Sequence, residues 1–146
     1  MAVAMLVGLA NTLLYSGFGG SPWGGPLAWR LEPWPLSGAY ALCAILAGLL
    51  ISAVVLGFMQ PGLQGTFFAR YGVLVLAVCL GGVSLSVLLS AVTYSFDDHL
   101  TAAKRITWFL STVPFTAVAG GVLGAAEGVI LAFPLAAILG RFRAAG

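Results

Sequence analysis

The chain has 146 residues, of which 61% are hydrophobic and 7% are charged, and its formal net charge at pH 7 is +2. Soluble domains carry about 25% charged residues, so a water-soluble fold of this composition could not cover its own surface. The six basic residues form no stripe that could follow a phosphate backbone, which excludes a nucleic-acid-binding protein. We therefore expect an all-α integral membrane protein, a single transmembrane domain over 1–146 with the lipid bilayer as its first partner.

The first two apolar runs each predict a membrane-spanning helix. The first covers about 1–18 and has no Lys or Arg ahead of its apolar residues, so we interpret it as a retained helix and not as a secretory signal. The second covers 38–59 and ends at Gln60-Pro61-Gly62, a strong helix breaker. A short turn reaching Arg70 then leads to the next run, so we expect adjacent, antiparallel helices on either side of it.

The segment 19–37 between these runs holds four prolines, four glycines and three tryptophans. Such a composition cannot propagate a helix, and it is typical of an irregular interfacial segment on the bilayer surface. Trp23, Trp29 and Trp34 are the expected interface anchors. We favour anchoring among lipid headgroups, and docking onto another subunit is the alternative.

The second half of the chain predicts two further spans. The third covers 71–96 and is long enough to cross with some tilt. The following apolar stretch, 106–140, would be about 52 Å long as one helix, which is too short for two crossings with a turn. We place a division at Pro114, with an interfacial segment at 98–113 and a fourth span at 115–139. One long, kinked helix is the alternative. The predicted architecture is a four-transmembrane-helix bundle.

Small residues recur every four positions on three of the predicted spans. Lipid gives helices no hydrophobic reason to associate, so such grooves, where backbones approach closely, are the usual contact faces. We interpret the three sets as packing within the bundle, with an oligomer face as the alternative. The sets are Ala44, Gly48 and Ser52; Gly82, Ser86 and Ser90; and Gly120, Gly124 and Gly128.

Glu127 is the ionisable residue that lies well inside an apolar run. A central carboxylate costs about 2.5–3.5 kcal/mol if charged, so its presence favours a function. Gly120, Glu127 and Pro134 share a helix face at a spacing of seven, and Pro134 makes that face bendable. We expect either a proton- or cation-handling carboxylate or a protonated, hydrogen-bonded structural acid. Asn11 and the hydroxyls of the third span are its possible hydrogen-bonding partners.

The remaining polar and sulfur-containing residues indicate no cofactor and no metal site. Cys43 and Cys79 lie in apolar runs without metal-ligand spacing, and adjacent residues such as Asp97, Asp98 and His99 cannot readily converge on one ion. We interpret the latter three as a capped interfacial turn. No catalytic constellation is visible, so we do not expect an independent enzyme.

The expected function is that of a small non-enzymatic membrane subunit packing within a larger membrane protein complex. The alternative is an oligomeric small transporter or ion- or proton-conducting component that uses Glu127, and a homo-oligomer is therefore a further possible assembly. Four crossings divide the basic residues equally between the two sides. The position of Arg141 and Arg143 directly at a helix end favours cytoplasmic termini, in a plasma or inner membrane.

Overall fold

The computed structural model describes the backbone of residues 34–95 and 99–144, and the side chains of residues 42–95 and 99–141. Their secondary structure is helical, which confirms the all-α part of the predicted fold class for these residues. In chain order the helices are α2 (Trp34–Phe58), α3 (Gln60–Gln64), α4 (Phe67–Ser95) and α5 (Ala102–Ala144). The predicted span 1–18 and most of the segment 19–37 lie outside the described residues.

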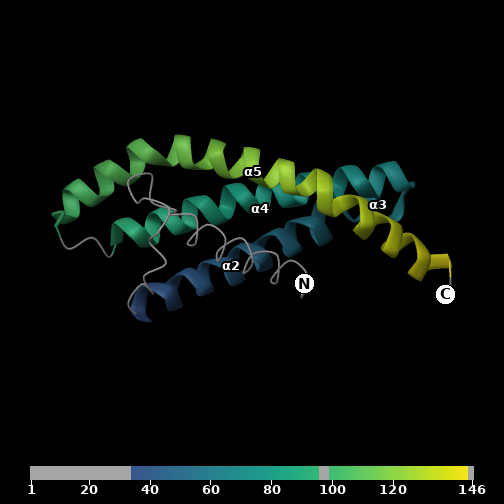
Figure 1. Ribbon diagram of the computed structural model, residues 1–146, viewed down its shortest axis with the longest axis horizontal. Coiled ribbons are helices and arrows are strands. Elements are labelled where there is room, and N and C mark those ends of the chain that lie inside the picture. The colour runs from purple at the N-terminus through teal and green to yellow at the C-terminus, as the bar shows by residue number, and fades with distance from the viewer. Residues whose placement is uncertain (1–33, 96–98, 145–146) are drawn as a thin grey trace.

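The helices form an elongated layer in which α4 lies between α2 and α5 (Figure 1). The chain turns back at α3, so α2 and α4 are antiparallel and adjacent, as expected. It turns again after α4, so α4 and α5 are also antiparallel. The contact between α4 and α5 is much the more extensive of the two, and α5 arches along α4 in Figure 1.

The starts of α2 and α4 both differ from prediction. α2 begins at Trp34 and α4 at Phe67, each about one turn before the expected start. In α4, Thr66 accepts the backbone N–H of Ala69 at its hydroxyl, at 3.4 Å, and that of Arg70 at its carbonyl, at 3.0 Å. These bonds start α4 at Phe67, whereas we expected the preceding turn to reach Arg70.

The segment Gln60-Pro61-Gly62 follows the end of α2, as predicted, but it also begins the short helix α3. Pro61 lies in the first turn of α3, where a missing N–H costs nothing. Gly62 brings α3 onto α4, since an added Cβ atom would lie 2.5 Å from the Cγ2 atom of Val73. The breaker thus makes a compact corner between α2 and α4.

The expected division at Pro114 is not seen, because α5 continues through both Pro114 and Pro134. A proline removes one helical hydrogen bond, yet nearby hydroxyls and small local adjustments can stabilise the surrounding turn. Thr112 donates to the carbonyl of Trp108 at 2.9 Å and to that of Phe109 at 3.1 Å, and Thr116 donates to that of Val113 at 3.1 Å. The long, kinked helix that was the alternative is therefore the observed one.

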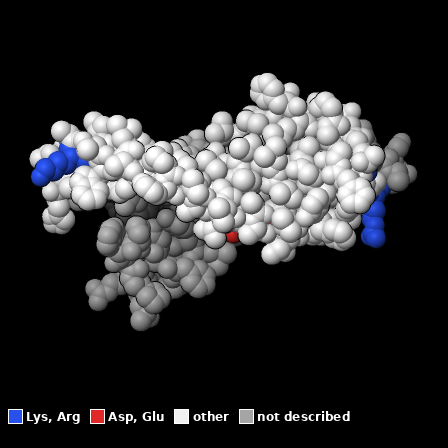
Figure 2. Space-filling view, turned by 90° about the horizontal axis from the view of Figure 1, so that it is seen from above, with Lys and Arg blue, Asp and Glu red and all other residues white. Residues whose placement is uncertain are grey.

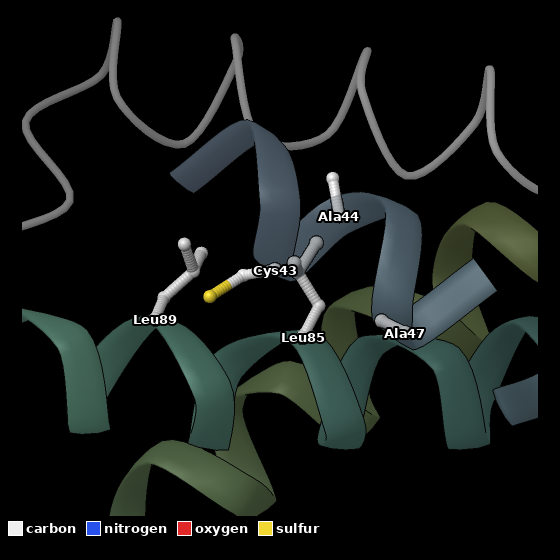
Figure 3. Close-up of a cluster of buried hydrophobic side chains, with 5 residues drawn as sticks. All are labelled: Cys43, Ala44, Ala47, Leu85 and Leu89. Atoms are coloured by element: carbon white, nitrogen blue, oxygen red, sulfur yellow. The ribbon is translucent and has the colours of Figure 1, made fainter. Parts of the chain in front are cut away.

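A cluster of buried side chains joins α2 to α4 (Figure 3). Cys43 of α2 lies between Leu85 and Leu89 of α4, and Ala47 lies one turn further along α2. Ala44, also in the cluster, points away from α4. Leucine side chains of α4 thus pack against small side chains of α2, which lets the two helices lie close together.

Buried residues differ from exposed ones mainly in side-chain size and not in polarity. Five of the nine buried hydrophobic residues in the described ranges are alanines, and no large side chain is fully enclosed. Nineteen large hydrophobic side chains are exposed, among them Phe58, Phe115 and Ile130, at 84%, 77% and 72%. Two helical stretches, Phe67–Ser95 and Ala102–Arg141, are long and apolar enough to cross a membrane, while the apolar part of α2, Leu42–Phe58, is shorter.

Candidate functional site

The most distinctive feature is the glycine seam, the line along which Gly120, Gly124 and Gly128 of α5 contact α4. A Cβ atom added to Gly124 would lie 2.6 Å from the carbonyl oxygen of Val78 and 3.1 Å from the Cα atom of Cys79. One added to Gly128 would lie 3.0 Å from the carbonyl oxygen of Val75. These neighbours are backbone atoms, so the two helices meet backbone to backbone.

The closest approach along the seam pairs Gly120 with Gly82. An added Cβ atom on either glycine would collide with the carbonyl oxygen of the other, and on Gly120 it would also collide with the hydroxyl of Ser86. The hydrogens that stand in place of these Cβ atoms therefore point at carbonyl oxygens across the interface. This is the arrangement of reciprocal Cα–H···O contacts that recurs where helices pack closely.

The stripe of small residues on α5 continues beyond the three predicted glycines. Ala132 and Ala136 follow at the same spacing of four and are both 0% exposed. A period of four exceeds the 3.6 residues of a helical turn, so the stripe drifts around α5 by about 40° per step and favours a right-handed crossing. Sequence reasoning missed these two residues, although counting on in fours from Gly128 would have found them.

Two side chains of α4 donate hydrogen bonds across the seam to carbonyl groups of α5. The Tyr71 hydroxyl donates to the Val129 carbonyl at 3.2 Å, and the Cys79 thiol donates to the Gly121 carbonyl at 3.3 Å. The Phe67 ring also packs edge-on against Phe133, with ring centroids 5.5 Å apart. Neither donor was identified from the sequence.

The other two predicted small-residue sets differ in what they contact. In α4, Gly82 and Ser86 face the seam, whereas Ser90 donates to the carbonyl of Ser86 at 2.8 Å within its own helix. In α2, Ala44 and Gly48 are buried, and Ser52 donates to the carbonyl of Gly48 at 2.7 Å. The predicted stripe on α5 thus forms a continuous backbone contact with α4.

Glu127 is the one acidic residue whose side chain the structure describes, and it lies at the edge of the glycine seam. Its position is 22 residues after Arg105 and 14 before Arg141, or roughly 33 Å and 21 Å along the helix. Gly120 is buried, Glu127 half-buried and Pro134 exposed. The predicted face therefore turns away from α4 along the helix. Residues seven apart are rotated by about −20° around the helix axis, whereas residues four apart, as in the seam, are rotated by about +40°.

Charged side chains gather at the two ends of the molecule, with a largely uncharged surface between them (Figure 2). At one end the guanidinium group of Arg70 lies against Gly140, the neighbour of Arg141. At the other end Lys104 and Arg105 begin α5 near the last residue of α4, and Arg105 donates from Nη1 to the Ser95 carbonyl at 2.8 Å. Between the two ends, the described ranges form one long apolar section.

Several predicted site residues cannot be placed. Asn11, Trp23 and Trp29 lie outside the described residues, as do Asp97 and Asp98. Trp34 is the first residue of α2, but its side chain is not among those described. Among the residues searched, no group of three or more His, Cys, Asp or Glu side chains could hold a metal ion.

In comparisons with known proteins, the chain matches no family model, no curated protein and no solved structure. Three features of the fold bear on the function of the chain: the glycine seam, the exposed apolar surface and the basic ends.

Proposed function

We propose that this chain is a four-span integral membrane protein that acts as a small non-enzymatic subunit within a larger membrane protein complex. The observation that carries the proposal is the distribution of side chains by size. Alanine and glycine make up most of the interior contacts, while most of the large hydrophobic side chains face outward. In water this surface would be an aggregation hazard, whereas in lipid it matches the solvent.

The dimensions of the two long helices support a membrane location. From Arg70 to Ser95, α4 runs roughly 38 Å, which exceeds the roughly 30 Å hydrocarbon core of a bilayer. From Arg105 to Arg141, α5 runs roughly 54 Å, so it crosses with a strong tilt or arch. α5 then has basic side chains at both membrane surfaces, and α4 adds Arg70 at one of them. In a four-span arrangement the end with Arg70 and Arg141 is also the side of both termini, which we assign to the cytoplasm.

The subunit role follows from the placement of the apolar faces. In Figure 1, α2 and α5 lie on opposite sides of α4, so their outer faces point in different directions. Leu42, Leu46 and Leu50 form an exposed row on α2, and Val118 and Val122 are exposed on α5. Such faces offer lateral contacts to other membrane helices on more than one side. A complex subunit uses these contacts, and they explain more of the described residues than any site chemistry does.

Gentle extraction of the full chain with a C-terminal tag tests the proposal. We expect the protein to resist alkaline carbonate washing and to be purified with stoichiometric membrane partners identified by mass spectrometry. Gly124→Leu should release it from the assembly, because a large side chain separates α4 from α5, while Gly72→Ala, at an open position on α4, should not. Release by carbonate would refute the membrane location, and a monomer without partners would refute the subunit role.

A second candidate function is supported by the position of Glu127. A half-buried carboxylate midway along the apolar section, at the edge of a helix interface, is placed as a proton- or cation-coupling group would be. In this alternative the chain is an oligomeric small transporter or conducting component. Glu127→Gln should then abolish ion or proton flux in liposomes while helicity and oligomer size stay unchanged, and Glu127→Asp should retain part of it. Full flux through the Gln variant would eliminate this candidate.

A further inference from the structure

The arginines at the two ends of the α4–α5 pair are engaged to different degrees. Arg105 donates from Nε to the Leu100 carbonyl at 3.0 Å and from Nη1 to the Ser95 carbonyl at 2.8 Å. Arg70 makes one hydrogen bond within the described structure, from Nε to the Gly65 carbonyl at 3.2 Å. The Nη1 and Nη2 atoms of Arg70 make no hydrogen bond within the described structure.

The Arg70 side chain is held in place despite its missing acceptors. Its guanidinium lies over Gly140 of α5, where a Cβ atom would be 2.6 Å from Nη1 and 3.7 Å from Nη2. Nη1 is fully enclosed without a hydrogen-bonding partner, while Nη2 is not enclosed in this way. An enclosed charged donor is costly unless a nearby negative group compensates it. The open side at Nη2 is where such a group can approach.

The surroundings of Arg70 combine positive charge with exposed aromatic rings. Arg141, which follows Gly140, is exposed at the same end. Phe68 is 81% exposed and Phe133 is 62% exposed, and both pack edge-on against the ring of Phe67. The end of the α4–α5 pair thus carries both cations and exposed aromatic rings. A phospholipid has the matching arrangement, a phosphate above its glycerol and acyl chains.

We infer that Arg70, assisted by Arg141, binds the phosphate of a phospholipid headgroup at the end of the α4–α5 pair. The inference rests on the proposed membrane location, which places this end at the depth of the headgroups. Nε is bonded to the Gly65 carbonyl and Nη1 is enclosed, so Nη2 is the donor that reaches a phosphate oxygen in a charge-assisted hydrogen bond. Aromatic rings are common at this depth of the membrane. A carboxylate of a partner protein would satisfy the charge but would leave the exposed aromatic rings at this end, Phe68 and Phe133, without a role.

The experiment is native mass spectrometry of the delipidated full chain in detergent, titrated with phosphatidylglycerol. We expect the wild type to retain the lipid, Arg70→Gln to weaken binding by about tenfold, and Arg70→Lys to restore only part of it. The control is Lys104→Gln at the opposite end, which should bind as the wild type does. Each variant is first checked for unchanged helicity, and Arg141→Gln, which should weaken binding to a smaller extent, provides a second test should Arg70→Gln not fold.

The possible outcomes separate the sources of the negative charge. Equal binding by wild type, Arg70→Gln and Arg141→Gln overturns the inference. So does displacement of the lipid by millimolar inorganic phosphate, which would assign the site to the free ion. Loss of a co-purified protein from Arg70→Gln, with lipid retention unchanged, overturns it in favour of a partner carboxylate. A wild type that resists carbonate washing but shows no dependence on either arginine refutes this inference alone and leaves the membrane location intact.

Discussion

Gly124→Ala tests the central contact of the glycine seam with the smallest possible change. The added methyl group would lie 2.6 Å from the Val78 carbonyl oxygen, 3.1 Å from the Cys79 Cα atom and 3.2 Å from the Cys79 carbonyl oxygen. All three are backbone atoms and cannot rotate aside. Because the preferred separation is about 3.5 Å, α5 must retreat by roughly 0.9 Å, which removes about a quarter to a half of each dispersion contact there.

The size of the effect follows from opposing contributions. Alanine favours the helical backbone by about 1 kcal/mol over glycine. Against this stand the weakened dispersion contacts and the Cα–H···O contacts, each worth about 0.5–1 kcal/mol. We expect a net loss of about 1–3 kcal/mol in the free energy of unfolding, the usual range for an overpacked interior.

The assay is reversible unfolding in mixed micelles with a rising fraction of SDS, followed by circular dichroism. Gly72→Ala is the matched control, since it makes the same change in α4 at a position with no atom within 4 Å of the added Cβ. We expect this control to be neutral or slightly stabilising. A Gly124→Ala variant that unfolds with the wild type, or a Gly72→Ala variant that loses as much stability, would refute the backbone-contact interpretation.

Two further changes can be measured in the same assay. Tyr71→Phe removes the hydrogen bond to the Val129 carbonyl and should cost about 0.6 kcal/mol, the average for such bonds between membrane helices; a loss several times larger would mean that the hydroxyl has a further role. Gly121→Ala places a methyl group 3.1 Å from the Cγ2 atom of Val83. That atom belongs to a side chain that can adjust, so the loss should be less than half that of Gly124→Ala, and an equal loss would contradict this reasoning.

The sequence was informative wherever a local property decides the outcome. Composition alone predicted an all-helical protein, because so few charged residues leave no polar surface for a soluble fold. The end of α2 at Phe58 and that of α4 at Ser95 lie within one residue of prediction, since the breaker at Gln60-Pro61-Gly62 and the polar turn after α4 are local signals. The spacing of four in α5 likewise identified a stripe of small residues before its neighbours were known.

Other features depended on which residues the fold brings together. Proline suggested a division at Pro114, whereas hydroxyl bonds within the helix and packing against α4 accompany an unbroken α5. Glu127 was placed on a face with Gly120, but the drift of the seam leaves it at an edge. A spacing along one helix defines a face, and it does not define the angle at which another helix crosses that face.

The sequence by itself thus determined the all-helical fold, the main helix ends and the existence of small-residue stripes, because each follows from composition or from contacts a few residues apart. Only the tertiary structure decided that Gly82 meets Gly120, that the Tyr71 hydroxyl reaches the Val129 carbonyl and that the Arg70 guanidinium lies over Gly140. These contacts join residues 38 to 70 positions apart. They depend on the register and crossing of α4 and α5, which packing between the two helices sets.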